Sequence, residues 1–369
     1  MADIFRKTKG FKLAQLLESR TKAELKDIVQ ILELPRYAGL RKNEVVEKLN
    51  ADLPEEFNFL LSHMDGLEYE VLQYLSSEGG AVQADNLTNS MGERLASLGM
   101  VFMVMIDDTE MFVIPEELAA IFRESDTEEF FEIIKRNQEV VLLAQGLLNR
   151  YGVLETKVLF DMICSYMNMS IDEETLFMVL RVSEAVYGII EVGVTYCSHS
   201  FCEDRRSVVI GARELGNLEY KSFTHRQILE YSIQDYYEVT PALVRFREFI
   251  KKHFDIAEKT LNYRTVFLLF QLAADKSIDE IVEYLLKGFK AIPHNALEEF
   301  SEIIADLNNT TGKWALKGYS PEEILEIEKN GSLPDEGAEK PKLTLIKGRN
   351  LKPCPCGSGK LYKDCCGRK

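Results

Sequence analysis

Apolar residues recur at helical spacing over most of this 369-residue chain. The pattern is clearest after residue 222, where apolar positions three or four apart alternate with charged ones. Capping residues mark helix starts at Thr224, Thr240 and Ser277. We therefore predict a helical domain over 222–328, with helices in the segments 224–239, 240–261, 263–276, 277–289 and 295–309.

Residues 65–125 show a different order of elements. The segment 67–82 has helical spacing and ends at Gly79 and Gly80, and a second amphipathic stretch follows it. Two strand-like runs come next, VFMVMI and MFVIP, joined by the turn sequence DDTE. The order helix, helix, strand, strand is that of a winged helix, so we expect a winged-helix-like unit over 59–126.

A similar order recurs further along the chain. Three segments with helical spacing, at 139–154, 155–167 and 172–192, run into a strand, and RRSVVIGA would be the returning strand. This order predicts a second winged-helix-like unit over 127–221. In the stretches that would read DNA, the first unit offers only Arg94 and the second offers Arg181 beside three carboxylates. A DNA-reading helix is basic, so protein scaffolding is the favoured use of both units.

A shorter pattern occupies residues 21–50. Thr21 with Glu24 forms a capping box, Pro35 ends the first helix, and a second helix follows the extended connector PRYAGLRK. The apolar positions of the two helices are Leu25, Ile28, Val29 and Leu32, then Val45, Val46 and Leu49. This helix, extended segment, helix arrangement resembles the SAP and Rho-N-terminal modules, and we assign it to residues 1–58.

The resemblance implies that the connector contacts nucleic acid. Arg36, Arg41 and Lys42 would meet phosphates, and Tyr37 would be available to stack on a base. The alternative is a solvated connector on a docking module, because residues 1–60 carry a net charge of only +1, from 11 Lys and Arg against 10 Asp and Glu. Both interpretations stay open at this point.

Charge is distributed unevenly along the chain. The whole chain carries −16, whereas residues 340–369 carry +8, from nine Lys and Arg against one Asp. With +1 on residues 1–60, the remaining residues, 61–339, are left with −25. An acidic body repels phosphate backbones, so contacts with nucleic acid or the ribosome are expected at the two ends. The segment 329–350, rich in Gly, Pro and charge, is the expected linker to the tail.

Four of the seven cysteines lie close together in the tail, which we place at 351–369. Cys354, Cys356, Cys365 and Cys366 supply four thiolates, the ligand set that selects zinc in a reducing compartment. Glycines between the two pairs allow the turn that brings the pairs together. Four protein ligands leave no open position on the metal, so the site is expected to be structural.

The segment PCPCGSGKLYKDCCG resembles the SEC-C motif, of the SecA C-terminal zinc-binding type. The resemblance implies a bound zinc ion and docking to a protein partner or the ribosome, with Lys360 and Lys363 as candidate contacts. Two other interpretations are disfavoured. A disulfide between the adjacent Cys365 and Cys366 would be strained, and GSGK lacks the flanking Gly and the Ser or Thr of a phosphate-binding loop.

No pattern in the sequence predicts an enzyme. CSHSFC gathers Cys197, His199 and Cys202, but the spacing fits no zinc pattern, and we interpret the segment as a hairpin tip. The other histidines lack a neighbouring nucleophile or acid, and no dinucleotide fingerprint follows a strand. A catalytic site assembled from distant residues stays an alternative. Trp314, the only tryptophan, is expected to pack the end of the helical domain, with an exposed recognition element as the alternative.

Neither a membrane span nor an export signal is visible, because no apolar stretch approaches roughly 18 residues and the N-terminus has no clean apolar region. We therefore expect a cytoplasmic, mainly α-helical, multidomain protein with small β wings and no small-molecule substrate. The favoured hypothesis is a non-enzymatic zinc-binding adaptor. Its basic tail docks to a protein, ribosome or RNA partner, and its acidic body makes a second contact. The alternative is a nucleic-acid-binding regulator; the partner, pathway and oligomeric state stay undecided.

Overall fold

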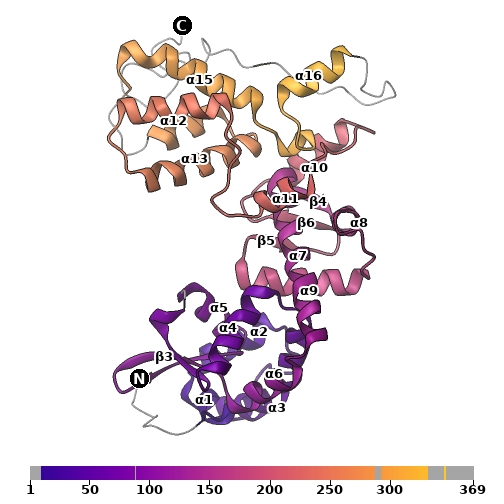
Figure 1. Cartoon of the computed structure of the whole chain (residues 1–369), viewed down its shortest axis with the longest axis vertical. Helices are drawn as coiled ribbons and strands as arrows, with labels where there is room; N and C mark the ends of the chain where they lie inside the picture. The colour runs from indigo at the N-terminus through magenta and orange to yellow at the C-terminus, as the bar shows by residue number, and fades with distance from the viewer. Residues whose placement is uncertain (1–9, 88, 287–291, 331–344, 346–369) are drawn as a thin grey trace. The chain divides into compact units, whose positions relative to one another are not determined.

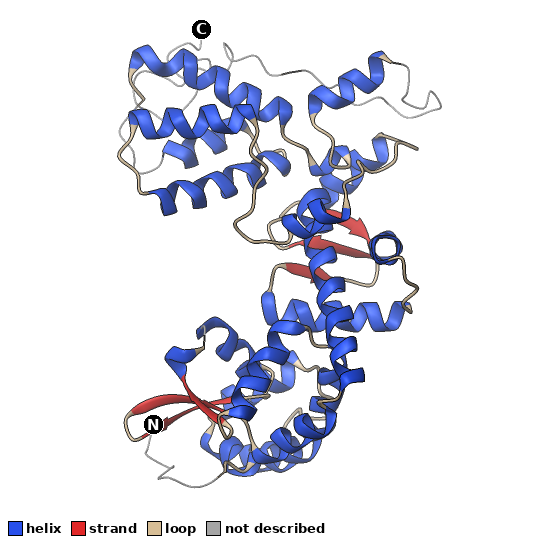
Figure 2. Ribbon diagram, in the orientation of Figure 1, coloured by secondary structure: helices blue, strands red, loops and turns tan. Residues whose placement is uncertain are grey.

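The computed structural model describes residues 10–87, 89–286, 292–330 and 345. Most of them are helical, and two small antiparallel sheets have the strand orders β1-β3-β2 and β4-β6-β5 (Figure 2). The mainly α-helical class with short strands is thus confirmed. The chain divides into unit 1, residues 1–141 and 163–192, and unit 2, residues 142–162 and 193–369. The predicted zinc tail, with its four cysteines, Lys360 and Lys363, lies outside the described residues, as does nearly all of the predicted linker.

Unit 1 combines a set of helices with the first sheet (Figure 1). Its elements in chain order are α1 Leu13–Ser19, α2 Lys22–Ile31, α3 Lys42–His63, α4 Gly66–Ser77, β1 Ala81–Gln83, η1 Ala84–Asn86, α5 Asn89–Ser97, β2 Phe102–Ile106, β3 Thr109–Val113, α6 Glu116–Ser125, most of α7 Glu128–Tyr151, α9 Glu173–Tyr187 and β5 Ile190–Val192.

The first helices of unit 1 begin and end at local signals. The Thr21 hydroxyl accepts the backbone N–H of Glu24 at 3.2 Å, and the Glu24 carboxylate accepts the N–H of Thr21 at 2.7 Å, so the predicted capping box is confirmed. α2 ends at Ile31, before Pro35. α3 then runs unbroken to His63, through the expected end of the first module at residue 58. The finer division of the chain into small domains stays a prediction.

The first sheet contains the predicted hairpin. β2 and β3 pair antiparallel with Phe102 opposite Val113, and β1 pairs on the other side of β3. Asp107 and Asp108 form the turn with φ values of +46° and +60°, a left-handed conformation that Asp tolerates better than bulky residues. The two strand-like runs and their turn are therefore confirmed.

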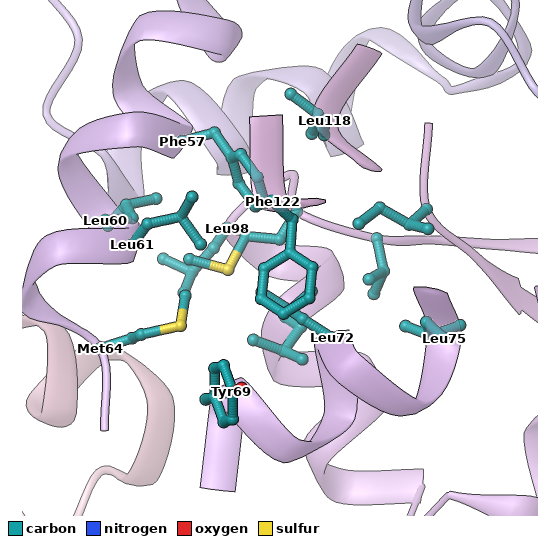
Figure 3. Close-up of a cluster of buried hydrophobic side chains, with 14 of the residues drawn as sticks. Phe57, Leu60, Leu61, Met64, Tyr69, Leu72, Leu75, Leu98, Leu118 and Phe122 are labelled. Carbon is teal, nitrogen blue, oxygen red and sulfur yellow. The ribbon is translucent and has the colours of Figure 1, made fainter. Parts of the chain in front are cut away.

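Side chains from the helices and the sheet of unit 1 form a shared core. Figure 3 shows the ring of Phe122, from α6, among apolar side chains of α3 and α4. Phe57 and Leu61 come from α3, while Tyr69 and Leu72 come from α4. Burial of large apolar side chains at helical spacing stabilises this unit, at roughly 1.5–3 kcal/mol for each side chain fully removed from water.

Unit 2 contains the paired strands β4 and β6 and a group of packed helices. Its elements are the end of α7, β4 Val153–Glu155, most of α8 Thr156–Met167, β6 Tyr196–His199, α10 Arg205–Glu214, α11 His225–Tyr231, α12 Pro241–His253, α13 Glu258–Ala273, α14 Ile278–Leu286, η2 His294–Ala296, α15 Leu297–Thr310, η3 Trp314–Leu316 and α16 Pro321–Lys329. Helices α12, α13 and α15 lie side by side (Figure 1), and Phe246, Phe249 and Phe300 are buried in their core.

Helix starts in unit 2 are confirmed, but two predicted helices are wrong. The segment 224–239 is helical only as far as Tyr231, where α11 ends. Thr224 and Thr240 cap α11 and α12 through their hydroxyls, and Ser277 accepts the N–H of Glu280 at 3.3 Å. The segment 240–261 is not one helix, because α12 ends at His253 and α13 begins at Glu258. Phe254 has an extended backbone here and joins the same core, so burial of its ring favours the break.

Two interpretations around residue 200 are also wrong. RRSVVIGA is not a strand but lies in helix α10, where the Asp204 carboxylate caps the helix by accepting the N–H of Ser207 at 3.0 Å. The returning strand is β6, which begins at Tyr196 and includes the first three residues of CSHSFC, so this segment is not a hairpin tip. β6 pairs antiparallel with β4, with Val153 opposite Ser198.

Trp314 packs the end of the helical region, as expected. Its side chain is 1 % exposed, and its indole N–H donates to the carbonyl oxygen of Asn149 at 2.9 Å. Gly152 has φ +70°, and a Cβ there would lie 2.4 Å from the indole, so only glycine leaves room for the ring. The alternative of an exposed recognition element is thereby excluded for this side chain.

Candidate functional site

A surface groove in unit 1 is lined by apolar and acidic side chains. Its volume is about 530 Å³, and α2, α3 and α9 provide most of its lining. Two of its apolar side chains are substantially exposed, Ile31 at 38 % and Phe59 at 41 %. We call it the acidic groove and define it by its apolar residues Ile31, Leu32, Phe59, Leu60, Leu98, Met178 and Val182 and its carboxylates Asp27, Glu33, Glu56 and Glu184.

Carboxylates dominate the charge of the acidic groove. Its one arginine, Arg181, pairs with Glu33 and with Glu184, each at 2.7 Å. Burial raises the pKa of Glu56, and the nearby Asp52 and Glu55 raise it further. The groove therefore offers apolar surface inside a negative electrostatic potential, which favours a cationic, amphipathic partner over a phosphate backbone.

Sequence reasoning missed the acidic groove because its walls are far apart in the chain. Arg181 was considered only as a possible DNA contact of α9, whereas the structure uses it to bridge two carboxylates. The available signal was one extra apolar residue near the end of each of two helices, Ile31 in α2 and Phe59 in α3. Neither residue belongs to the buried face of its helix, and exposed apolar residues that gather on a surface indicate a binding site.

The predicted connector contacts are only partly available. Arg36 and Arg41 are exposed, and Arg36 has φ +67°. The Tyr37 hydroxyl instead donates to Asp52 at 2.8 Å, while the ammonium of Lys48 lies 4.5 Å from the centre of its ring. The ammonium of Lys42 donates to the Glu18 carbonyl oxygen at 2.7 Å. Tyr37 is thus already engaged by neighbouring residues, which weakens its case as a base-stacking platform.

Two buried carboxyl groups form a polar cluster at the start of α4. Asp65 is 2 % exposed and Glu68 is 1 % exposed. The Glu68 carboxyl accepts the Asp65 N–H, and the Tyr187 hydroxyl donates to Asp65, both at 2.7 Å. Asp65 Oδ2 and Glu68 Oε1 have no hydrogen-bond partner among the described residues. Burial raises the pKa of both groups, and repulsion from Asp65 adds to the effect on Glu68, so we infer that Glu68 holds a proton in the folded protein.

Replacing Glu68→Gln is expected to remove a pH dependence of stability. Because the folded-state pKa of Glu68 is raised, its stabilising contribution is complete below the unfolded-state pKa near 4.5 and is lost as pH rises through the folded value. The variant should therefore gain free energy of unfolding relative to the natural chain as pH rises above about 5, by up to about 1.4 kcal/mol per pH unit. Urea unfolding at several pH values measures this difference.

The exposed Glu124, on α6, supplies the control, because it is no part of this cluster. Glu124→Gln should keep the pH dependence of the natural chain. If the Glu68→Gln variant and the natural chain differed by the same free energy of unfolding at every pH, ionisation of Glu68 would not destabilise the folded protein, and the prediction would be wrong.

Metal-ligating residues do not cluster elsewhere in the described ranges. Across 10–87, 89–286 and 292–330, no group of three or more His, Cys, Asp or Glu side chains is placed to hold a metal ion. His199 is 5 % exposed, and burial lowers its pKa to about 4, so it is neutral at physiological pH. Cys197 and Cys202 are buried. Separately, none of the described helices is long and apolar enough to cross a bilayer.

The terminal cysteines have a donor set that suits zinc, although they lie outside the described residues. Four thiols, arranged as Cys354 with Cys356 and Cys365 with Cys366, can satisfy a tetrahedral ion without any other ligand. The chemistry of the residues present therefore fits the metal.

Comparison with known proteins finds similarity at this end of the chain. Residues 352–368 match the model of the SEC-C motif. A protein translocase subunit SecA of Thermodesulfovibrio yellowstonii is 39 % identical over 92 residues, which are 24 % of this chain and 10 % of that protein. The SecA of Clostridium acetobutylicum is 52 % identical over 50 residues, which are 12 % of this chain and 6 % of that protein.

Each match covers a small part of this chain and a smaller part of the relative. The chain spans about a tenth or less of the length of these SecA relatives, and no solved structure matches it. The matched motif lies in the basic, cysteine-rich end. The chain carries a SEC-C motif at residues 352–368.

Proposed function

We propose that the protein is a non-enzymatic adaptor with two contact surfaces. The SEC-C segment carries the proposal, because it joins four thiols and a positive charge to a long acidic body. In this proposal Cys354, Cys356, Cys365 and Cys366 hold one zinc ion, which gives the short segment its fold. Lys360 and Lys363 then face a protein or ribosome partner.

The acidic groove supplies the second contact in this proposal. Its apolar floor fits the hydrophobic side of an amphipathic helix, and Asp27, Glu33 and Glu56 fit basic residues at the edges of that helix. Two weak contacts on one chain reinforce each other, because the first raises the effective concentration of the second.

The strand orders support the finer proposal of two winged-helix-like units. In each, a strand follows the first helix and pairs with the last strand of a later hairpin, as in β1-β3-β2 and β4-β6-β5. The SAP-like head is likewise a proposal, and its support is the order of helix α2, connector and helix α3. For both units, protein scaffolding is better supported than DNA reading, because Arg181 is already paired with two carboxylates.

Two sets of substitutions in the full-length chain separate the two contacts. Lys360→Glu with Lys363→Glu should lower ribosome or protein-partner recovery from a bacterial lysate by at least about tenfold, since each lost charged contact is worth about 1.5–3 kcal/mol. Phe59→Glu should reduce a different set of partners, because it places a charge at the apolar floor of the groove. Quantitative mass spectrometry of the co-purified proteins, with and without nuclease, measures both effects.

Lys259→Glu is the matched control, because Lys259 is an exposed lysine at the start of α13, far from both surfaces in sequence. Its partner set should equal that of the natural chain. Full retention of every partner by the Lys360→Glu, Lys363→Glu variant contradicts the role of the tail. Loss of all partners on nuclease treatment would point to the nucleic-acid-binding alternative.

A further inference from the structure

Unit 2 contains a small pocket that the adaptor function does not use. Its volume is about 110 Å³, and it lies between the end of α7, the loop after α11, α13 and the loop after α15. We call it the Arg150 pocket and define it by Arg150, Lys221, Glu238, Val266, Phe270 and Gly312. Every one of these residues belongs to the same unit.

Arg150 is the unusual group in the pocket. Its guanidinium carbon lies 4.4 Å from the ring centre of Tyr231 and 5.1 Å from that of Phe223. Its Nε is buried without a hydrogen-bond partner, and no described residue forms an ion pair with its guanidinium. Aromatic faces offset part of the cost of partly withdrawing this cation from water, but they satisfy none of its N–H donors. A guanidinium held in place with unused donors is a ready partner for an anion.

The other polar groups of the pocket are already engaged. Lys221 pairs with Glu323 at 2.6 Å, and the Tyr231 hydroxyl donates to Glu238 at 3.0 Å. The Tyr236 hydroxyl donates to Glu230 at 2.9 Å. Glu323 thus neutralises Lys221, whereas no described residue pairs with the charge of Arg150, in a chain that carries −16 overall. One negative charge would balance Arg150.

Gly312 keeps the donors of Arg150 accessible. A Cβ at this position would lie 3.0 Å from Arg150 Nη2 and 2.4 Å from the carbonyl oxygen of Gly318. Any side chain there would crowd the guanidinium. Val266, Leu269 and Phe270 of α13 give the pocket an apolar wall.

We propose that the Arg150 pocket binds a compact monocarboxylate with a short apolar stem. The planar guanidinium matches the two oxygens of a carboxylate, and the apolar wall accepts the stem. Glu238 disfavours a dianion such as phosphate, because its carboxylate lines the same pocket and Lys221 is already paired with Glu323. The volume suits a small group, since a cavity of about 150 Å³ holds a benzene molecule. A free short-chain acid and the carboxylate of a peptide end share this chemistry.

Isothermal titration calorimetry of the full-length protein tests the proposal with four probes. They are propionate, inorganic phosphate, and a valine-ending tripeptide with a free or an amidated C-terminus. Propionate or the free tripeptide should bind saturably, while phosphate and the amidated tripeptide should bind at least about tenfold more weakly. Tighter binding of the free tripeptide than of propionate would identify a peptide end as the source, and the reverse order a free acid.

Two variants examine the pocket in different ways. Arg150→Ala removes the cation and should weaken carboxylate binding by at least about tenfold. Val266→Phe keeps Arg150 but fills the space beside it, and should weaken binding similarly even if Arg150→Ala disturbs folding, which circular dichroism reports. Arg226→Ala is the matched control, because this arginine is exposed and paired with Glu230, and it should change affinity by less than about twofold.

Three outcomes would overturn the proposal. The first is the absence of saturable binding of both propionate and the free tripeptide. The second is carboxylate affinity that is unchanged in a folded Arg150→Ala or Val266→Phe variant. The third is phosphate that binds more tightly than either carboxylate. The test is independent of the adaptor function, since none of the variants changes the tail or the acidic groove.

Discussion

Full-length protein purified under reducing conditions is expected to contain about one zinc ion per chain, and Cys365→Ser is expected to lose nearly all of it. Four thiolates saturate a tetrahedral ion, so an alcohol in place of one leaves an incomplete and weaker site. In zinc-finger peptides the metal supplies about 10–16 kcal/mol of apparent binding free energy, and a segment this short has no core to replace it. Elemental analysis measures the metal, and partner recovery should fall together with it.

Cys164→Ser is the matched control for this experiment. Cys164 lies on α8 and is only half-buried, so its replacement should leave both the zinc content and the partner set unchanged. In the natural chain, Cys354, Cys356, Cys365 and Cys366 should resist alkylation until a chelator removes the metal. Equal alkylation of the four thiols with and without chelator would contradict a bound zinc ion.

Trp314→Ala is expected to lower the free energy of unfolding of unit 2 by about 3–5 kcal/mol, the usual range for removing a buried aromatic side chain. The ring is 1 % exposed and shares a buried cluster with Val153 and Val208, which come from β4 and α10. Its loss leaves a cavity between these elements and removes the hydrogen bond to the Asn149 carbonyl oxygen. Urea unfolding followed by circular dichroism measures the change.

Tyr263→Ala provides the comparison within the same unit. Tyr263 is 63 % exposed, so its replacement should alter stability by less than about 0.5 kcal/mol. Trp314→Ala should also alter the position of Arg150, because the indole N–H donates to the carbonyl oxygen of Asn149, the residue that precedes Arg150. A stability loss no larger than that of Tyr263→Ala would mean that the surroundings of Trp314 collapse to fill the space.

The success of the helix predictions depends on how local their signals are. Thr21, Thr224 and Thr240 cap the helices that follow them, because a capping hydroxyl needs only a backbone N–H three residues away. The hairpin turn at Asp107 and Asp108 is local in the same sense. These elements could be read from the residues alone.

The errors arise where distant contacts outweigh local preference. Val208, Val209 and Ile210 are β-branched residues that favoured a strand, yet they lie in α10. The Asp204 cap and the burial of Val208 beside Trp314 favour the helix instead. Likewise, burial of Phe254 in the core of unit 2 interrupts a stretch whose spacing suited one long helix. The tertiary partner of each side chain was not visible in sequence.

The sequence by itself determined the cluster of thiols at Cys354, Cys356, Cys365 and Cys366, the basic charge around it, and most helix starts, since each depends on residues that are near neighbours along the chain. Only the tertiary structure decided the acidic groove, the burial of Glu68 beside Asp65, and the unpaired Arg150 among aromatic rings. Each of these features depends on packing between segments that are distant in sequence. Burial and electrostatic potential depend on distance in space, and folding alone sets that distance.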